Sequence, residues 1–156
     1  MVNYLYLQKK LNLDEKEKEA LPFHFLGQFQ VVRREQRNVL GGDLKPCSID
    51  PLTGFTISGS CEGHEADRGC HAVCAQVTAK FLEFSRQMGN DLSTPRPEYA
   101  FPGLKKGDRW CVCAARWEEA RAAGKAPLVV LESTHESALE HVKLSDLRKH
   151  ALDVAG

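Results

Sequence analysis

Strand-like and helix-like patterns alternate along the chain from residue 71 to its end. Apolar and other side chains alternate with a period of two over residues 71–77, and Thr78 can cap a helix that stops at Gly89. Further strands are predicted over 109–113 and 127–131, and further helices over 115–123, over 133–141 and after Ser145. This order predicts an α+β fold. About four helices should cover a small, partly parallel sheet of three or more strands, joined by long ordered loops.

The region before residue 71 carries few such patterns. Residues 38–70 are rich in turn-forming glycine, proline and aspartate, and only 55–57 is predicted as a short strand. An irregular segment of this length is unusual in a compact domain and is often functional. Residues 1–36 differ in character and are interpreted as an N-terminal arm. The 156-residue chain is therefore read as one domain over 38–153 plus this arm.

Charge and hydropathy exclude several classes of protein. Lys+Arg and Asp+Glu both number 21, so the chain lacks the basic excess of a nucleic-acid-binding protein. No stretch approaches the roughly 20 apolar residues that cross a bilayer. The N-terminus lacks the apolar core of a secretory signal. We therefore expect a soluble cytoplasmic protein without nucleic-acid or membrane partners, whose six cysteines are free thiols or metal ligands before they are disulfides.

Cysteines and histidines supply the candidate catalytic groups. On a strand, Cys111 and Cys113 share one face, and Cys74 would join them if its strand pairs with theirs. Thiolates are nucleophiles and soft-metal ligands, but buried cysteine also serves as a small apolar residue. The structural role is favoured over a reactive one, and metal ranks last because paired CxxC motifs are absent. No metal or cofactor is predicted.

Two histidines are candidate general bases. Imidazole titrates near pH ~6.5, so His71 or His135 could exchange protons at neutral pH. A pair such as Cys74 or Cys111 with His135 would meet the minimum for thiol catalysis. A histidine bonded to a backbone carbonyl is the alternative for either position.

The loop over residues 90–98 supplies the candidate binding groups. Pro95 and Pro97 stiffen its backbone, and Arg96 could hold a carboxylate or phosphate with two hydrogen bonds. Alternatively, these side chains satisfy the loop's own backbone or form ordinary ion pairs. The predicted ligand-binding residues are Asp91, Ser93, Thr94, Arg96 and Glu98.

Several runs of sequence resemble a known family. The matching runs are NVLG (38–41), PLTGF (51–55), HAVCA (71–75), GNDLSTPRPE (89–98), FPGL (101–104), GDRWCVCAARW (107–117) and TH (134–135). They resemble domain-of-unknown-function family 2237 (DUF2237), a mostly bacterial family. The resemblance implies a compact α+β domain over about residues 38–153 and brings no established activity, substrate or catalytic residue.

Two functional hypotheses follow from these residues. The first is a protein that binds a small molecule, or a thiol- and histidine-dependent enzyme, with a pocket near the 90–98 loop. The second is a non-catalytic interaction module in which the cysteines are structural. The patterns carry no signal for oligomeric state.

Overall fold

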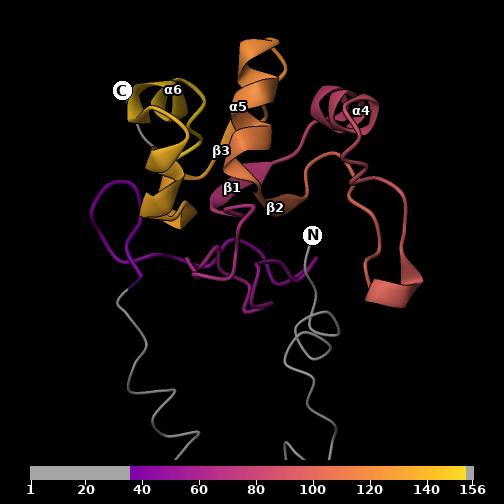
Figure 1. Ribbon diagram of the computed structural model, residues 1–156, viewed down its shortest axis with the longest axis horizontal. Coiled ribbons are helices and arrows are strands. Elements are labelled where there is room, and N and C mark those ends of the chain that lie inside the picture. Colours follow the sequence, from indigo (N-terminus) through magenta and orange to yellow (C-terminus); the bar gives the residue numbers. More distant parts are fainter. Residues whose placement is uncertain (1–35, 154–156) are drawn as a thin grey trace, which may run out of the picture.

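The computed structural model describes residues 36–153. The arm predicted over residues 1–36 lies outside this range except for its last residue. A three-stranded sheet stands at the centre, formed by β1 (Val73–Gln76), β2 (Arg109–Val112) and β3 (Leu128–Val129) in the order β2-β1-β3 (Figure 1). The α+β pattern of strands and helices is therefore present, with shorter strands than the sequence predicts.

The partly parallel sheet predicted from the sequence is wrong. β1 pairs with both β2 and β3 in the antiparallel sense. The helix between β2 and β3 does return the chain in the same direction, as a crossover connection requires. However, β1 lies between these two strands, so no hydrogen-bonded pair is parallel. Local patterns predict the crossover but do not reveal the intervening strand.

Three α-helices occur within residues 36–153, namely α4 (Ala79–Gln87), α5 (Ala114–Ala122) and α6 (Leu144–Lys149). The predicted start of α4 is confirmed, since the Thr78 hydroxyl accepts a hydrogen bond from the Phe81 N–H at 3.1 Å. Its predicted stop is confirmed by Gly89 at φ +87°.

The predicted fourth helix is wrong. Residues 131–140 form two 3₁₀ turns, η2 (Leu131–Ser133) and η3 (Glu136–Glu140). Ser133 was expected to cap a helix, but its hydroxyl donates to the Pro46 carbonyl at 2.8 Å. The ring of His135 accepts from the Ser137 N–H and caps η3 instead. A long-range contact has displaced the local cap.

The sheet separates two unlike layers. In Figure 1, α4, α5 and α6 lie on one side of the strands, and the irregular segment 36–70 runs along the other. The helical side holds the main hydrophobic core, where Phe81, Trp117, Leu131 and Leu147 are fully buried against the sheet. The strand predicted over 55–57 is wrong, because this stretch is a turn with Ile57 at φ +56°.

Two disulfides attach the irregular segment to the sheet. Cys47 is bonded to Cys74 of β1, and Cys61 to Cys111 of β2. The expectation of free thiols is therefore wrong for four of the six cysteines, while Cys70 and Cys113 are free. The bonded residues bring Cα atoms 5.7 and 5.4 Å apart although 27 and 50 positions separate them in sequence. Spacing alone could not reveal these contacts.

Buried threonine hydroxyls complete the junction. The backbone N–H of Cys111 donates to Thr53 at 2.9 Å, and that of Cys74 donates to Thr134 at 3.2 Å. Both threonines are almost fully buried. Because an unpaired buried N–H is costly, these hydroxyls stabilise the strands where ladder partners are lacking.

Among the residues the structure describes, no helix is long and apolar enough to cross a membrane.

We expect Thr53→Val to lower the free energy of unfolding by about 1–3 kcal/mol, because it keeps the side-chain shape but leaves the Cys111 N–H unpaired. Urea denaturation with the disulfides intact measures this loss. Thr56→Val is the matched control, since its hydroxyl has only a 3.4 Å contact to Glu62. Equal losses in the two variants would contradict the role of Thr53.

Replacing Cys61 and Cys111 together by alanine is expected to cost about 4 kcal/mol, because the cross-link closes a loop of 50 residues. Denaturation of the oxidised protein in the presence of a chelator measures the difference. The matched pair Cys47→Ala and Cys74→Ala should cost slightly less, since its loop has 27 residues. A double variant as stable as the parent would show that the link does not hold the segment.

Candidate functional site

A small cleft lies beside β2, one of the two edge strands of the sheet. Its volume is about 150 Å³, smaller than a typical pocket for a drug-sized ligand, so it suits a small ligand or one reacting end of a larger one. Its lining joins residues from four separate parts of the chain. These are His71, Asn90, Leu92, Trp110, Cys111, Val112, Cys113 and Arg116.

A histidine–aspartate pair forms one wall of the cleft. The Asp67 carboxylate contacts the Nδ1 of His71 at 2.7 Å and accepts the His71 backbone N–H at 2.8 Å. The Asp67 side chain is 5% exposed and that of His71 is 20% exposed. Burial alone would raise the pKa of Asp67, but hydrogen bonds and charge from His71 outweigh it and leave the pKa below its ordinary value. The pair is therefore a buried carboxylate facing an accessible imidazole.

The backbone around His71 is closely fitted. Cys70 has φ +49°, a left-handed conformation that is uncommon for residues other than glycine. A Cβ atom at Gly69 would lie 2.6 Å from Cε1 of His71, so only glycine leaves room for this ring position. Gly69 and Cys70 thus fix where the imidazole stands.

The opposite part of the cleft comes from the β2–α5 junction. Cys113 is the residue immediately before α5, and its side chain makes no capping hydrogen bond. Arg116, in the first turn, donates from Nη1 to the Met88 carbonyl at 3.1 Å and lies 3.3 Å from a carboxylate oxygen of Glu119. These contacts hold its positive charge beside the cleft. A helix N-terminus also favours negative charge nearby.

The two free cysteines have different surroundings. Burial raises the pKa of Cys70, and the nearby charges of Asp67, Glu140 and Cys113 raise it further against the opposing hydrogen bond of Ser137. The Sγ of Cys70 lies 3.5 Å from the Ser137 hydroxyl and is not among the lining atoms of the cleft. Cys113 lines the cleft and is half-buried. Of these two thiols, only Cys113 lines the cleft.

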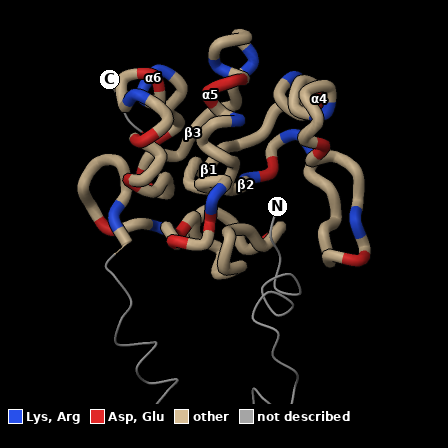
Figure 2. Tube along the Cα trace, in the orientation of Figure 1, with Lys and Arg blue, Asp and Glu red and all other residues tan. Residues whose placement is uncertain are grey.

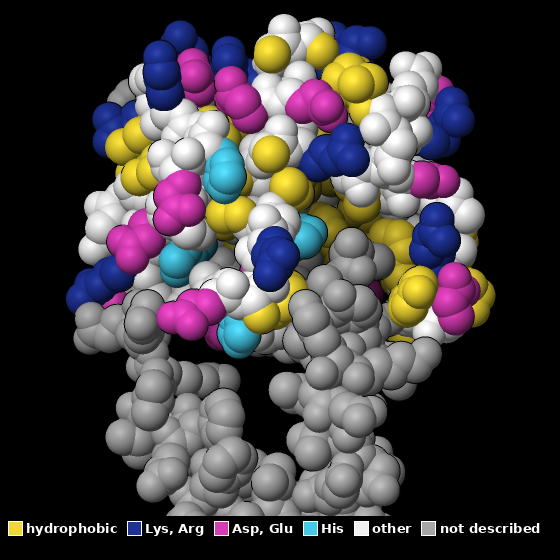
Figure 3. Space-filling view, in the orientation of Figure 1, with side chains coloured by type: hydrophobic (Ala, Val, Ile, Leu, Met, Phe, Trp, Pro, Cys, Tyr) yellow, Lys and Arg dark blue, Asp and Glu magenta, His cyan; other side chains and the backbone are white. Residues whose placement is uncertain are grey.

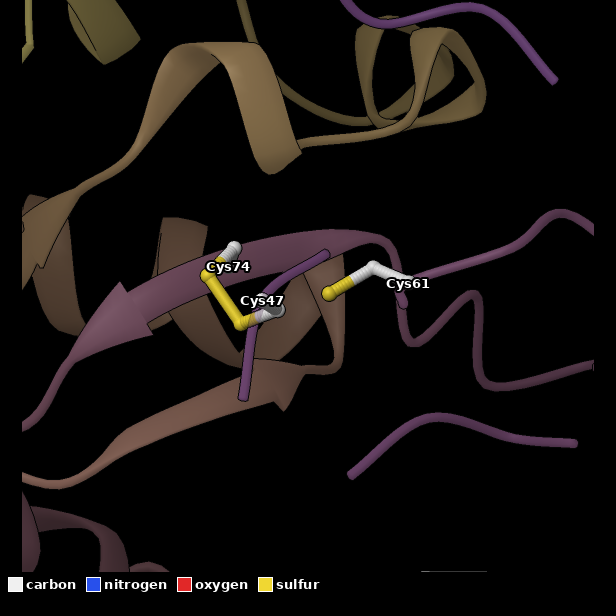
Figure 4. Close-up of side chains that lie close together, drawn as sticks. All are labelled: Cys47, Cys61 and Cys74. Carbon is white, nitrogen blue, oxygen red and sulfur yellow. A yellow bond between two sulfur atoms is a disulfide. The ribbon is translucent and has the colours of Figure 1, made fainter. Parts of the chain in front are cut away.

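The other four cysteines form the cysteine cluster, defined as Cys47, Cys61, Cys74 and Cys111. Cys74 and Cys111 lie directly opposite each other on β1 and β2, while Cys113 follows the end of β2. Figure 4 shows Cys47 bonded to Cys74 with the sulfur of Cys61 pointing toward them. The sulfur atoms of Cys47, Cys61 and Cys74 lie within 4.8 Å of one another. Disulfide bonding removes Cys74 and Cys111 as free nucleophiles in this state.

The second candidate base, His135, lies away from the cleft lining. Its ring Nδ1 is 2.8 Å from the Ser137 hydroxyl, and a Cβ at Gly63 would lie 2.4 Å from its Cε1. Burial lowers the pKa of His135, although the charges of Glu136, Glu62 and Glu140 oppose this. His135 therefore caps η3, and its ring packs against Gly63 of the irregular segment.

The predicted binding loop meets the cleft only at its beginning. Asn90 and Leu92 line the cleft, whereas the five predicted binding residues are not among its lining residues. The Asp91 carboxylate accepts from the Ser93 and Thr94 N–H groups at 2.9 and 3.1 Å. The Thr94 hydroxyl also donates to Asp91, at 2.6 Å. This bond is the largest cause of the lowered pKa of Asp91, and the two N–H bonds lower that pKa further. Arg96 and Glu98 are exposed.

Sequence reasoning did not name two residues of this site, Asp67 and Arg116, as candidates. Asp67 stands four positions before His71, and the turn between them brings its carboxylate back to the ring. The four-residue spacing can be read from the sequence, but no predicted helix or strand there indicates that the two side chains face each other. Arg116 lies three residues after Cys113 at the start of a predicted helix, a position that could have indicated positive charge near the thiol.

Charges are mixed over the described surface. Basic and acidic residues alternate along the trace in Figure 2 and are interspersed on the face drawn in Figure 3. Four of the ion pairs within residues 36–153 join neighbours on one helix, such as Glu118 with Arg121 and Glu83 with Arg86. Such exposed pairs contribute little to stability.

Comparison with known proteins gives one family. A family model described as "uncharacterized protein conserved in bacteria" (DUF2237) matches residues 37–151. The match confirms the resemblance seen in the sequence and covers the sheet, the helices, the cleft and the cysteine cluster. No curated protein matches the chain.

The Asp67–His71 pair predicts a specific acid response. Because the pKa of Asp67 is lower in the folded protein than its ordinary 3.8, its stabilising contribution is present above that value and is lost as the pH falls through the folded pKa. We expect the parent protein to lose more free energy of unfolding than Asp67→Asn between about pH 5 and pH 3. Urea denaturation across this range measures the difference, with Asp43→Asn, whose side chain is 94% exposed, as control. Parallel curves for parent and Asp67→Asn would contradict the coupling.

Proposed function

We propose a thiol-dependent function for this chain, which belongs to the DUF2237 family of uncharacterised proteins conserved in bacteria. In this proposal Cys113 is the nucleophile, His71 is its general base, and Asp67 positions His71. The observation that carries the proposal is the buried Asp67–His71 hydrogen bond in the wall of a cleft that a free cysteine also lines.

The state of the histidine supports its proposed role. An ionised carboxylate only accepts hydrogen bonds, so Asp67 favours the tautomer with the proton on Nδ1 of His71. The lowered pKa of Asp67 keeps the carboxylate ionised at neutral pH. The Nε2 atom is then left with its lone pair, which can accept a proton from a thiol. Asp67 also stabilises the imidazolium that results.

The proposed reaction is attack by a thiolate on an electrophilic carbon. His71 Nε2 takes the proton from Cys113, the sulfur bonds to a carbonyl carbon, and the leaving group departs with the proton returned by His71. Water then hydrolyses the thioester and frees the cysteine. The Arg116 guanidinium and the N-terminus of α5 favour a substrate that carries or develops negative charge.

The volume of the cleft limits what it would take. About 150 Å³ accommodates a small acyl or carboxylate-bearing group, while a larger substrate would extend outside. In the proposal, the exposed Arg96 and Glu98 would contact such an extension, and Asp91, Ser93 and Thr94 would hold the shape of their loop. Cys74, Cys111 and His135 are not assigned catalytic roles.

An interaction module is the second candidate. Its support is an exposed apolar turn on the irregular segment, where Ile49 is 78% and Leu52 is 46% exposed. The two residues are bridged across the turn. Exposed apolar side chains of this kind often mark a contact with another protein. Under this hypothesis neither free thiol has unusual reactivity.

Alkylation of the native full-length chain separates these candidates. With limiting iodoacetamide at neutral pH, we expect Cys113 to be labelled at least about tenfold faster than Cys70, because the pKa of Cys70 is raised by burial. His71→Gln and Asp67→Asn should each slow labelling of Cys113 by about tenfold. Peptide mass spectrometry reads both sites, and His135→Gln serves as the control that leaves the rate unchanged.

Turnover of p-nitrophenyl acetate provides a second readout. The parent should release p-nitrophenol with a burst that Cys113→Ser abolishes and Asp67→Asn reduces. If both free thiols are protected from iodoacetamide and no burst occurs, the thiol proposal is wrong and the interaction module is favoured. An equal rate of Cys113 labelling in the parent and in His71→Gln would also overturn the thiol proposal.

A further inference from the structure

We propose that the cysteine cluster is a metal site when it is reduced, with Cys47, Cys61, Cys74 and Cys111 binding one Zn²⁺ ion as thiolates. This inference is independent of the proposed thiol chemistry at Cys113. It departs from the sequence-based expectation that the protein holds no metal. The structure shows the cluster in its disulfide state, and the proposal concerns the same four residues after reduction.

The geometry of the cluster carries the proposal. Tetrahedral zinc bonds four sulfurs at about 2.3 Å, which places neighbouring sulfurs about 3.8 Å apart. The sulfurs of Cys47, Cys61 and Cys74 already lie within 4.8 Å of one another, and Cys111 is bonded to Cys61. Reduction lets each bonded pair of sulfurs separate. Modest side-chain movements would therefore bring the four sulfurs to tetrahedral spacing.

The origin of the four ligands resembles a structural metal site. Two come from paired positions on adjacent strands, Cys74 and Cys111. The other two, Cys47 and Cys61, come from the irregular segment and are drawn beside Cys74 in Figure 4. Metal sites of this kind join segments that have little secondary structure of their own. Residues 36–70 contain isolated bridges and turns but no named helix or strand. One ion would hold this segment to the sheet as the two disulfides do.

The surroundings of the cluster favour a soft metal. All four cysteines are at most 6% exposed, and Val130 is the fifth member of their separate apolar group. An all-sulfur donor set selects zinc or other thiophilic ions over magnesium or calcium. Zinc is the choice because four-coordinate Cys₄ sites are typical of structural zinc.

The chemistry between the two states balances with a dithiol reductant. Two reductant molecules are oxidised to their disulfides, and each protein disulfide gains two electrons and two protons to become two thiols. Binding of Zn²⁺ then releases the four thiol protons as the thiolates coordinate the ion. A cytoplasmic location, as predicted from the sequence, would maintain the reduced state. Two molecules of a low-molecular-weight disulfide would reverse the reaction, each accepting two electrons and being reduced to thiols, so that Cys47–Cys74 and Cys61–Cys111 re-form and the ion is released.

Metal titration of the full-length chain tests the proposal. The protein is reduced without oxygen or chelator, freed of reductant, and titrated with Co²⁺ and then Zn²⁺. We expect one Co²⁺ per chain, with the sulfur-to-metal charge transfer and intense visible bands of a tetrahedral thiolate site, and displacement by Zn²⁺. The oxidised chain should bind neither ion at this site.

Single serine variants assign the ligands. Cys47→Ser and Cys74→Ser should each weaken Zn²⁺ binding by more than about 100-fold, since each removes one of four thiolates. Cys70→Ser is the matched control outside the cluster and should bind as the parent does. Cys113→Ser should also bind zinc normally, which separates failure of this proposal from failure of the proposed catalytic role.

A second measurement keeps the proposal testable if a variant fails to fold. In the reduced parent, Zn²⁺ should protect four thiols from dithionitrobenzoate while Cys113 stays reactive. Circular dichroism should show native structure retained or regained when zinc is added. A reduced parent that binds no stoichiometric metal, or one whose metal leaves all six thiols equally reactive, would overturn the proposal.

Discussion

The junction between the irregular segment and the sheet is the constraint on which this structure depends. A segment of about 35 residues without a named helix or strand can stay folded only if something fixes it to a more regular part of the chain. Here Cys74 and Cys111 stand opposite each other on neighbouring strands, and each is linked to that segment. Thr53 and Thr134 satisfy the strand N–H groups at the same place. Covalent and polar contacts therefore replace the extended ladder that these short strands lack.

The cleft depends on the same strands. Cys111 belongs to the cysteine cluster and also lines the cleft, together with Trp110, Val112 and Cys113, so β2 and its end contribute to both. His71 enters from just before β1, fixed by Asp67, Gly69 and the left-handed Cys70. The groups that line the cleft are therefore positioned by strands that the disulfides link to the irregular segment.

Sequence patterns predicted much of the helical layer and less of the rest. The Thr78 cap and the Gly89 stop were recoverable, because each follows from local spacing. The parallel sheet was a wrong inference, since local order cannot show that β1 separates β2 from β3. The helix at 133–141 failed because Ser133 bonds the distant Pro46 carbonyl. His71 and Cys113 were named as candidates, but Asp67 and Arg116 were not.

By itself, the sequence determined the α+β composition, the family and the residues able to do thiol chemistry, because these depend on residue type and on short-range periodicity. Only the tertiary structure decided which cysteines are bonded and which are free. The partners Cys61 and Cys111 are 50 positions apart, and only the chain's path beneath the sheet brings them together. It also decided that His71 rather than His135 shares a cleft with a free thiol. Both the disulfide pairing and the position of His71 depend on contacts between distant parts of the chain, which local sequence patterns do not encode.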